Sequence, residues 1–350
     1  MGTAWTGPPR HGAKIGRMPA PPRVELALLP TPILKLERVS RRLGVEVYIK
    51  RDDLTGLLEA GGQVRKLEFL VGQALAQGAD TLITCGHPQS DMSRAVAAVA
   101  ARVGCRAVVA VDGRLGGTDD ANLLLARMLG AEVREAGARS RDKAAQEIAN
   151  EVRARGGRPY VIPEDGADEV GALGYLEGAV ELAAQINHGA PRFDTTVIAA
   201  RSGASHAGLL MGKYLSGLPS DILGVPVADP ADLVRERIAG FIAGAVRRFG
   251  FAIDRPKAIH LLDGYQSPDP GAVSDSDLRA LLELARDEGL LLDPADTISA
   301  FRGLLDTLTR DPKALGERVC FVHTGAPFGL FSLRERLSGL LGRTPTTQSE

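Results

Sequence analysis

Four loops in this chain carry the polar side chains that could do chemistry, and each follows an apolar run. The first is the glycine-rich turn AGGQ, residues 60–63, which opens into an apolar, alanine-rich segment. Such a turn at a helix start presents free backbone N–H groups and one side chain to a ligand. That side chain is Gln63. A carboxamide nitrogen is not a nucleophile, because its lone pair is delocalised into the carbonyl group, so covalent catalysis from this position is not expected.

The second loop, residues 85–94, holds three candidate catalytic groups where a strand-like run passes into a helix: His87, Ser90 and Asp91. His87 or Asp91 could act as a general base. Ser90 and Asp91 are equally well explained as helix N-caps, whose side chains accept hydrogen bonds from the free N–H groups of the first turn. Both explanations stay open from the sequence.

The third loop has the composition of an anion-binding site. Ser202, Gly203, Ala204 and Ser205 lie between a strand-like run and a helix. Small residues there leave backbone N–H groups free to hold a phosphate or carboxylate group. Arg201, directly before them, would add a bidentate partner for the same anion.

The fourth loop begins with His323 and Thr324 at the end of the last strand-like run. Together with His87 and His206, His323 is one of three histidines placed where a ligand could bind. The other three histidines are His11, in the N-terminal segment, and His188 and His260, which lie outside any such loop. Isolated histidines are more often packed or solvent-facing than catalytic.

The segments between these loops alternate between strand-like and helical patterns. The strand-like runs include DTLITCG, CRAVVAVDG, RPYVIP, DTTVIAARSG and ERVCFVHTG, and helical runs separate them. Strands that alternate with helices through short glycine-marked joints predict an α/β protein with open parallel sheets. In such folds ligands bind at the carboxyl ends of the strands, where the four loops lie.

The composition is that of an ordinary globular protein and narrows the classes of partner. Of the 350 residues, 44% are hydrophobic and 24% charged, and the formal net charge is −1. This balance gives no reason to expect nucleic acid or an anionic membrane as a partner. Cys85, Cys105 and Cys320 are too few and too scattered for a disulfide framework or a zinc site, and they fit a reducing cytoplasm. No apolar run approaches the roughly 20 residues of a membrane span.

Several blocks of the sequence resemble the family of D-cysteine desulfhydrases and 1-aminocyclopropane-1-carboxylate deaminases. They are LPTPILKLERVSRRLGVEVYIKRDDLTG, RKLEFLVGQALAQGADTLITCG, RPYVIP, GALGY, EGLLLDPADT and FVHTG, spread from Leu29 to Phe331. The resemblance implies the two-domain fold type II of enzymes that use pyridoxal 5′-phosphate (PLP), similar to the β chain of tryptophan synthase. A small domain of residues 67–174 would then be inserted in a large domain of residues 25–66 and 175–340, with flexible tails at 1–24 and 341–350.

The resemblance implies PLP as the cofactor, but it places Gln63 where the family has the lysine that binds PLP covalently. Without an amine there, the Schiff base cannot form and the lysine's proton transfer is also missing. The cofactor therefore stays open. Lys66, about one helical turn further on, could supply the amine instead, and Lys50 is a weaker alternative.

Further departures from the family pattern fall on the loops that would face the cofactor and the substrate. Asp91 stands where the family has the asparagine that contacts the 3′ oxygen of PLP, and Arg201 stands where glycine is usual. Pro270 and Asp296 each stand where the family has a tyrosine, although Tyr265 remains just upstream of Pro270. Pro327 and Phe328 change the loop that the resemblance places near the pyridine ring of PLP. The scaffold blocks stay family-like, which is typical of a retained fold with a changed site.

Three functions are consistent with this sequence. The first is an enzyme that performs acid–base chemistry, such as elimination, isomerisation or cyclisation, on an anionic or amino-acid-like small molecule. Its catalytic residues would be Ser90, Asp91, His87 and Tyr265, and its binding residues Gln63, Arg201, Ser202, Gly203, Ala204, Ser205 and Thr324. The second is a PLP-dependent lyase or deaminase of a small amino acid, with Lys66 recruited or PLP held without a covalent bond. The third is a non-catalytic protein that binds a ligand or a partner chain. The resemblance further implies a homo-oligomer.

Overall fold

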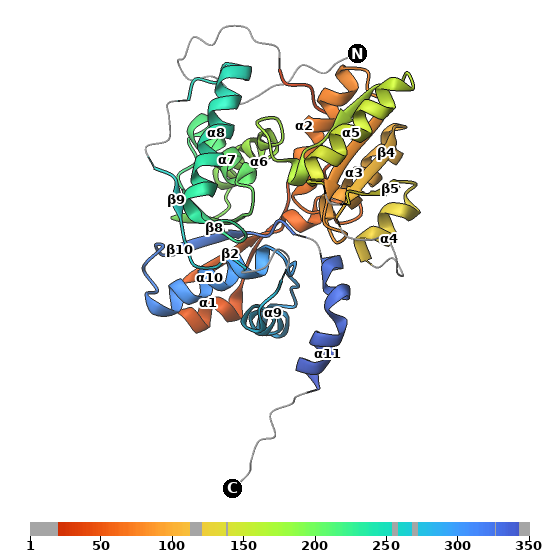
Figure 1. Cartoon of the computed structure of the whole chain (residues 1–350). Coiled ribbons are helices and arrows are strands. Elements are labelled where there is room, and N and C mark those ends of the chain that lie inside the picture. The colour runs from red at the N-terminus through yellow and green to blue at the C-terminus, as the bar shows by residue number, and fades with distance from the viewer. Residues whose placement is uncertain are drawn as a thin grey trace.

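The computed structural model describes residues 20–112, 121–137, 139–253, 258–267, 272–325 and 327–342. Within these residues the chain forms two mainly parallel sheets with helices on their faces (Figure 1). The prediction of an α/β protein with open parallel sheets is therefore confirmed. Pro270 lies outside the described residues.

The larger sheet has six strands among the described residues. Their order is β1 (Ile33–Lys35), β2 (Glu46–Lys50), β10 (Arg318–Val322), β7 (Thr195–Ala200), β8 (Asp221–Pro226) and β9 (His260–Leu261). The short edge strand β1 pairs antiparallel with β2, and the other pairs are parallel. Parallel neighbours bring the loops that follow β7 and β10 to the same edge of the sheet.

The smaller sheet has four parallel strands in the described part of the chain. Their order is β5 (Glu132–Glu135), β4 (Arg106–Val111), β3 (Thr81–Gly86) and β6 (Pro159–Val161). Every residue of β3 is buried, because helices cover both faces of this sheet. Leu82 packs into the core beneath α3 and Ile83 into the core beneath α5. All four strands fall inside the predicted small domain.

The helices surround these sheets. They are α1 (Glu37–Leu43), α2 (Gln63–Ala76), α3 (Asp91–Val103), α4 (Ala121–Met128), α5 (Arg141–Ala154), α6 (Ala172–Asn187), α7 (Ala204–Ser216), α8 (Ala231–Phe249), α9 (Asp275–Glu288), α10 (Thr297–Arg310) and α11 (Arg334–Leu341), with the short 3₁₀ helices η1 (Asp52–Leu54), η2 (Glu164–Gly166) and η3 (Pro327–Leu333). Figure 1 shows α6, α7 and α8 on one face of the larger sheet and α1, α9 and α10 on the other. None of the described helices is both long and apolar enough to span a bilayer.

Alternate residues of each central strand enter different cores. In β10, Phe321 packs into the core beneath α9 and α10, whereas Val322 packs into the core shared by α6 and α7. A strand buried on both faces reads as a continuous apolar run, as VCFV does here. This double burial fixes the register of the strand and so the position of the loop that follows it.

Helices α2, α6 and α7 pack with almost no space between their backbones. A methyl group on Gly208 would lie 2.2 Å from the carbonyl oxygen of Ala172, and one on Gly174 would lie 2.4 Å from that of Arg65. Larger residues would push these helices apart. The glycines thus fix how the N-terminus of α7 lies relative to the N-terminus of α2.

The two chain ends were predicted to be flexible tails, and residues 1–19 and 343–350 lie outside the described residues. Residues 20–24 run along α2. The backbone N–H of Val24 donates to the carbonyl oxygen of Glu68 at 2.9 Å, and Arg23 forms an ion pair of 2.6 Å with the Glu68 carboxylate. The last part of the predicted N-terminal tail is thus held against α2.

Candidate active site

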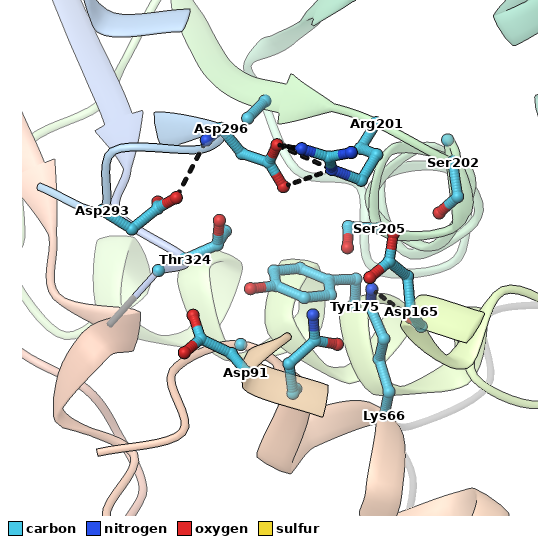
Figure 2. Close-up of a pocket in the computed structure, with 15 residues that line it drawn as sticks. Lys66, Asp91, Asp165, Tyr175, Arg201, Ser202, Ser205, Asp293, Asp296 and Thr324 are labelled. Atoms are coloured by element: carbon cyan, nitrogen blue, oxygen red, sulfur yellow. Dashed lines mark hydrogen bonds and ion pairs between the residues drawn. The ribbon is translucent and has the colours of Figure 1, made fainter. Parts of the chain in front are cut away.

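A polar cavity lies where the carboxyl ends of the two sheets meet, and Figure 2 shows the side chains that point into it. Its empty volume is about 530 Å³. It is lined by Gly62, Gln63, Lys66, Asp91, Asp165, Tyr175, Ala199, Arg201, Ser202, Gly203, Ser205, Asp293, Asp296, Thr324 and Gly325. The loops after β3, β6, β7 and β10 all contribute, as expected for a ligand site in an open α/β fold.

Gln63 is the first residue of α2, and the turn before it is too tight for side chains. A methyl group on Gly61 would lie 2.3 Å from the carbonyl oxygen of Thr324, and one on Gly62 would lie 2.0 Å from the hydroxyl of Tyr175. The N–H of Gly62 donates to Thr324 O at 2.7 Å. The Oε1 atom of Gln63 is buried and has no hydrogen-bond partner among the described residues. An unpartnered buried acceptor in a cavity lining is suited to a ligand that donates a hydrogen bond.

Lys66 follows one turn later on α2, and its amine also lines the cavity. The side chain is buried, and Nζ donates to the carbonyl oxygen of Asp165 at 2.8 Å (Figure 2). Burial lowers the pKa of Lys66, although the carboxylates of Asp165 and Asp296 oppose this shift. Asp165 has a positive φ of 55°, which is uncommon for a residue other than glycine. The lining thus contains an amine that loses its proton more easily than an exposed lysine.

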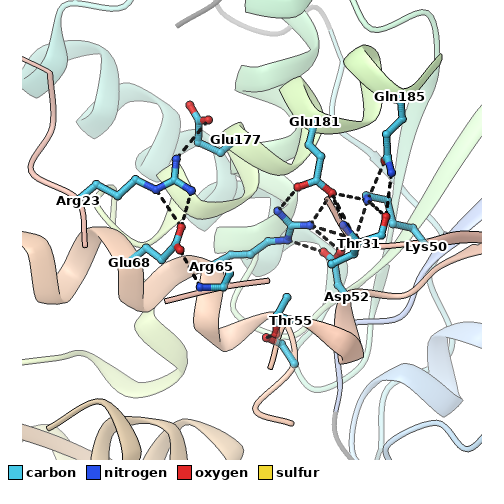
Figure 3. A network of polar contacts seen from close by, with 12 residues as sticks. Arg23, Thr31, Lys50, Asp52, Thr55, Arg65, Glu68, Glu177, Glu181 and Gln185 are labelled. Carbon is cyan, nitrogen blue, oxygen red and sulfur yellow. Dashed lines mark hydrogen bonds and ion pairs between the residues drawn. The ribbon is translucent and has the colours of Figure 1, made fainter. Parts of the chain in front are cut away.

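A buried ionic network holds α2 in this orientation (Figure 3). Arg65, which is 1% exposed, binds Asp52 through Nη2 at 2.8 Å and Glu181 through Nη1 at 2.9 Å. Lys50 adds a contact of 2.5 Å to Glu181 and donates to Thr31 Oγ1 at 2.6 Å. Burial would lower the pKa of Arg65, but Asp52 and Glu181 outweigh it and hold this pKa well above its usual value. Lys50 is therefore occupied in this network and does not line the cavity.

Asp91 is the first residue of α3, and Ser90 is the N-cap of that helix. The hydroxyl of Ser90 accepts the N–H of Ser93 at 3.3 Å, so the structure shows Ser90 in the N-cap role. The Oδ1 atom of Asp91 accepts instead from Arg94 Nη2 and from Asn122 Nδ2, both at 3.0 Å.

The environment of Asp91 favours its protonated form. Burial raises the pKa of the Asp91 carboxyl to about 6; Arg94 opposes this shift, and the neighbouring Asp293 carboxylate adds to it. A carboxyl group with a pKa near neutrality can both accept and donate a proton under physiological conditions.

Arg201 and Asp296 form a bidentate ion pair across the cavity. Arg201 Nη2 lies 2.6 Å and Nε 2.7 Å from Asp296 Oδ1, and Nε lies 3.0 Å from Oδ2 (Figure 2). Asp296 raises the pKa of Arg201 above its usual value, so the guanidinium stays charged. An anion would have to compete with this carboxylate for Arg201.

The loop before α7 has the expected shape of an anion cradle. Gly203 has a φ of +89°, and a methyl group there would lie 2.7 Å from the Ile238 side chain. Ser202, Gly203 and Ser205 line the cavity at the N-terminus of α7, whereas Ala204 is fully buried beneath them. Free N–H groups and the positive end of the helix dipole favour an anion at this position.

Comparison with known protein families shows to which family this chain belongs. A family described as "Pyridoxal-phosphate dependent enzyme" matches residues 24–325. The chain belongs to this family. A D-cysteine desulfhydrase of Yersinia enterocolitica is 38% identical over 317 residues, which cover 89% of this chain and 96% of that protein.

Two solved structures give the same result for the fold. The structure of an ACC deaminase homologue is 34% identical, has a TM-score of 0.83 and covers 91% of this chain and 96% of its own. A fungal L-serine ammonia-lyase from Rhizomucor miehei, at 18% identity, has a TM-score of 0.65 over 91% of this chain and 99% of its own. The expected resemblance to PLP fold type II is thus confirmed.

The cavity fits the coenzyme of this family at one end only. The cradle before α7 suits the PLP phosphate, since it offers free N–H groups and the hydroxyl of Ser205. A covalent bond to the aldehyde of PLP requires a primary amine, and Gln63 has none. Lys66 is the only lysine in the described lining of the cavity.

The charge of the lining also differs from what a phosphate dianion favours. Four carboxyl groups line the cavity, those of Asp91, Asp165, Asp293 and Asp296, against two cationic side chains. Burial raises the pKa of Asp293, and Asp296 adds to this shift. The excess of acidic groups disfavours binding of a dianion. PLP therefore cannot be attached covalently at Gln63. Attachment at Lys66 would require the acidic groups of the lining to be neutralised.

Several candidate residues from the sequence do not line the cavity. His87 is exposed, and its Nδ1 accepts the N–H of Gln89 at 3.2 Å. Tyr265 lies in the core beneath α9 and α10, with Arg302 over its ring at 4.9 Å and Arg310 donating to its hydroxyl at 3.3 Å. Thr324, by contrast, lines the cavity.

The two buried histidines also lie outside the lining. His206 is fully buried with no hydrogen-bond partner among the described residues, and burial lowers its pKa to about 3. His323 Nε2 lies 3.0 Å from the carbonyl oxygen of Leu291, and burial lowers the pKa of His323 as well. Both imidazoles are therefore neutral parts of the packed interior.

Three polar residues of the lining were not singled out from the sequence at all: Tyr175, Asp165 and Asp293. Tyr175 belongs to the block GALGY, which reads as scaffold. Asp293 belongs to the block LLLDPADT, in which the sequence analysis singled out only Asp296. Asp165 follows RPYVIP after one intervening residue, Glu164, and an acidic pair just after a strand-like run was the signal that could have identified it.

Proposed function

We propose that the protein is a small-molecule enzyme that performs acid–base chemistry on an anionic, amino-acid-like substrate in this cavity. The observation that carries the proposal is the position of Asp91. Its carboxyl, with a pKa raised to about 6, faces the same cavity as the anion cradle of α7. Elimination, isomerisation and cyclisation all need a proton removed from one atom and delivered to another, which such a group can do.

Each part of the lining has a proposed role. The anion cradle, Ser202–Ser205, binds the carboxylate of the substrate. Asp91 takes a proton from the bound substrate, while the hydrogen bonds from Arg94 and Asn122 fix the orientation of its carboxyl group. Gln63 Oε1 accepts a hydrogen bond from the substrate and orients it, since that atom has no other described partner.

Burial is what makes Asp91 suitable for this role. In water an aspartate has a pKa of about 3.9 and is a weak base, whereas a carboxyl shifted toward neutrality is a stronger base that is still mostly ionised at pH 7. Exclusion of water also strengthens the attraction between the substrate anion and the N–H groups of α7.

A direct test measures proton transfer by the purified protein. A panel of small amino acids and hydroxy acids is incubated with the protein in D₂O, and mass spectrometry records deuterium incorporation, loss of a small molecule or ring closure. Asp91→Asn is expected to lower the turnover of any active compound at least about 100-fold. Asp311→Asn, at an exposed site away from the cavity, is the matched control and should retain activity.

Two results would contradict this proposal. Turnover by the Asp91→Asn protein at the wild-type rate would remove Asp91 from the mechanism. No turnover of any compound by the wild type would favour the third function, a non-catalytic binding protein. Assembly as a homo-oligomer stays a prediction from the family resemblance, and a cytoplasmic location stays a prediction from the scattered cysteines.

The position of Lys66 supports a second candidate function, a PLP-dependent lyase or deaminase. Its amine lines the cavity, and burial lowers its pKa. In this reading Ser202, Gly203 and Ser205 would hold the phosphate and Lys66 would supply the amine. The coenzyme, when bound, would withdraw electrons from the substrate carbon. Absorption of visible light after addition of PLP, abolished by Lys66→Arg and retained by Lys213→Arg, would support this candidate.

A further inference from the structure

Arg94 connects three separate parts of the structure through one buried guanidinium group. Its side chain is 0% exposed, lies on α3 one turn after Asp91 and binds Asp91 Oδ1 at 3.0 Å. Its Nε donates to Asn122 Oδ1, on α4, at 2.6 Å. Its Nη1 also donates to the carbonyl oxygen of Leu58, and Nη2 lies 3.4 Å from that of Glu59.

The turn that Arg94 holds is an unusual one. Leu57, Leu58 and Glu59 have positive φ angles of 49°, 56° and 50°, a conformation that residues with a side chain rarely adopt. The turn leads directly into the glycine-rich segment before Gln63. Strained backbone persists only where its surroundings hold it in place, and the two carbonyl groups bound to Arg94 supply such a restraint.

The open face of the same guanidinium is covered by an aromatic ring from the C-terminal part of the chain. The Phe328 ring centroid lies 4.6 Å from Arg94 Cζ, within the range of a cation–π contact. Phe328 belongs to η3, which follows β10 of the larger sheet, whereas Arg94 belongs to the smaller sheet's layer of helices. The stacking therefore joins the two domains at the Asp91 end of the cavity.

We propose that Phe328 is a positioning residue of the cavity. By covering the Arg94 guanidinium, its ring holds that side chain on the Leu58–Glu59 turn and on Asp91. The segment Pro327–Leu333, the turn before Gln63 and the Asp91 carboxyl are then connected as one unit through Arg94. This inference rests on the proposed function only because Asp91 is the group being positioned.

The chemistry of a guanidinium explains why an aromatic ring is needed here. The N–H donors of Arg94 point outward in its plane, where Asp91, Asn122 and the turn carbonyls accept four hydrogen bonds. The faces of the guanidinium make no hydrogen bonds, and an aromatic ring covers such a face favourably because its π electrons attract the positive charge. An aliphatic side chain of similar size covers the same area without that attraction.

The test compares two substitutions of Phe328 with a control in the same helix. Hydrogen–deuterium exchange, read by mass spectrometry on the full chain, reports the opening of the peptide that covers residues 56–63. Phe328→Leu is expected to speed this exchange about tenfold, and Phe328→Tyr to leave it unchanged, because tyrosine keeps the aromatic face. Phe331→Leu is the control, since Phe331 is 61% exposed in the same segment.

A second variant keeps the test decisive if Phe328→Leu folds poorly. Arg94→Lys retains the charge but cannot keep the planar set of hydrogen bonds, so it should speed the same exchange. If the ring acts through Arg94, adding Phe328→Leu to Arg94→Lys should give little further increase. The NMR signal of the Arg94 Nε–H group, slow to exchange in the wild type, should broaden in Phe328→Leu alone among the three phenylalanine variants.

Three outcomes would overturn the inference: exchange in Phe328→Leu at the wild-type rate, an equal increase in Phe331→Leu, or fully additive increases in the double variant. None of these measurements needs a substrate. Failure to find a substrate would therefore count against the proposed function and leave this inference intact. Failure of the exchange experiments would count against this inference and leave the proposed function intact.

Discussion

The amine of Lys66 and the carboxamide of Gln63 line the same cavity from positions three residues apart on α2. Gln63 stands where the family resemblance expects the PLP lysine, and its Oε1 atom has no described hydrogen-bond partner. Lys66 donates to the carbonyl oxygen of Asp165. The cavity thus contains a buried amine one helical turn away from Gln63.

Gln63→Lys is expected to restore covalent binding of PLP. The cradle before α7 is present for the phosphate, and the new amine would stand at the family position. The variant should become coloured on addition of PLP, and borohydride should fix the coenzyme to residue 63, as shown by peptide mass mapping. Gln63→Arg, with a similar length but no primary amine, serves as the control. A Gln63→Lys protein that stays colourless would show that the acidic lining excludes the coenzyme.

Asp91→Asn is expected to change how stability depends on pH. The folded-state pKa of about 6 lies above that of an unfolded aspartate, so the folded state binds the extra proton. The stability due to this proton is complete below about pH 4 and is lost as the pH rises through about 6. The free energy of unfolding is measured by urea denaturation for both proteins. The value for Asp91→Asn minus that for the wild type should therefore increase by up to about 3 kcal/mol between pH 4 and pH 7.

A difference between the two proteins that stays constant over this pH range would contradict the raised pKa of Asp91. Shifted groups that do not interact with Asp91, such as Glu164 with a pKa of about 7, contribute equally to both proteins and cancel in the difference.

Asp296→Asn is expected to strengthen anion binding. Asp296 now holds Arg201 through a bidentate ion pair, so its neutralisation frees a guanidinium beside the anion cradle and removes one negative charge from the lining. The dissociation constant for inorganic phosphate, measured by calorimetry, should fall about tenfold, and Arg201→Ala should raise it. Equal phosphate affinity in the wild type and Asp296→Asn would place the anion elsewhere.

Glu181→Gln is expected to destabilise the fold severely. The substitution removes the carboxylate with which both the buried guanidinium of Arg65 and the amine of Lys50 form ion pairs. Breaking a buried ion pair costs about 3–5 kcal/mol. Burial would raise the pKa of Glu181, but Arg65 and Lys50 outweigh it and lower this pKa, so the stability is present at neutral pH and is lost as the pH falls through the folded-state pKa. Asp221→Asn, at the exposed pair with Lys213, should change the free energy of unfolding by less than about 1 kcal/mol.

The fold could be read from the sequence because its signals are local. The runs DTLITCG and ERVCFVHTG are apolar over the length of a strand and end in glycine or polar residues, and they form β3 and β10. The cavity could be placed because the carboxyl ends of parallel strands share an edge. Gln63, Asp91, Ser202 and Thr324 follow from that rule and do line the cavity.

The remaining features depend on contacts between residues far apart in the sequence. Arg201 and Asp296 are 95 residues apart, so nothing local to Arg201 shows that a carboxylate already holds it. Tyr265 kept its place in the family-like pattern, yet it packs beneath Arg302 in the core beneath α9 and α10. The rotation of α2, which turns Lys66 into the cavity, is set by the buried network around Arg65 and not by the helix itself.

The central claim is that the cavity acts through Asp91 and not through a covalently bound coenzyme. Its most direct test is the intact mass of the wild-type protein after incubation with PLP and reduction with borohydride, with Gln63→Lys treated in parallel. We expect no reduced adduct on the wild type and one adduct on Gln63→Lys. A stoichiometric adduct on the wild type that maps to Lys66 would contradict it.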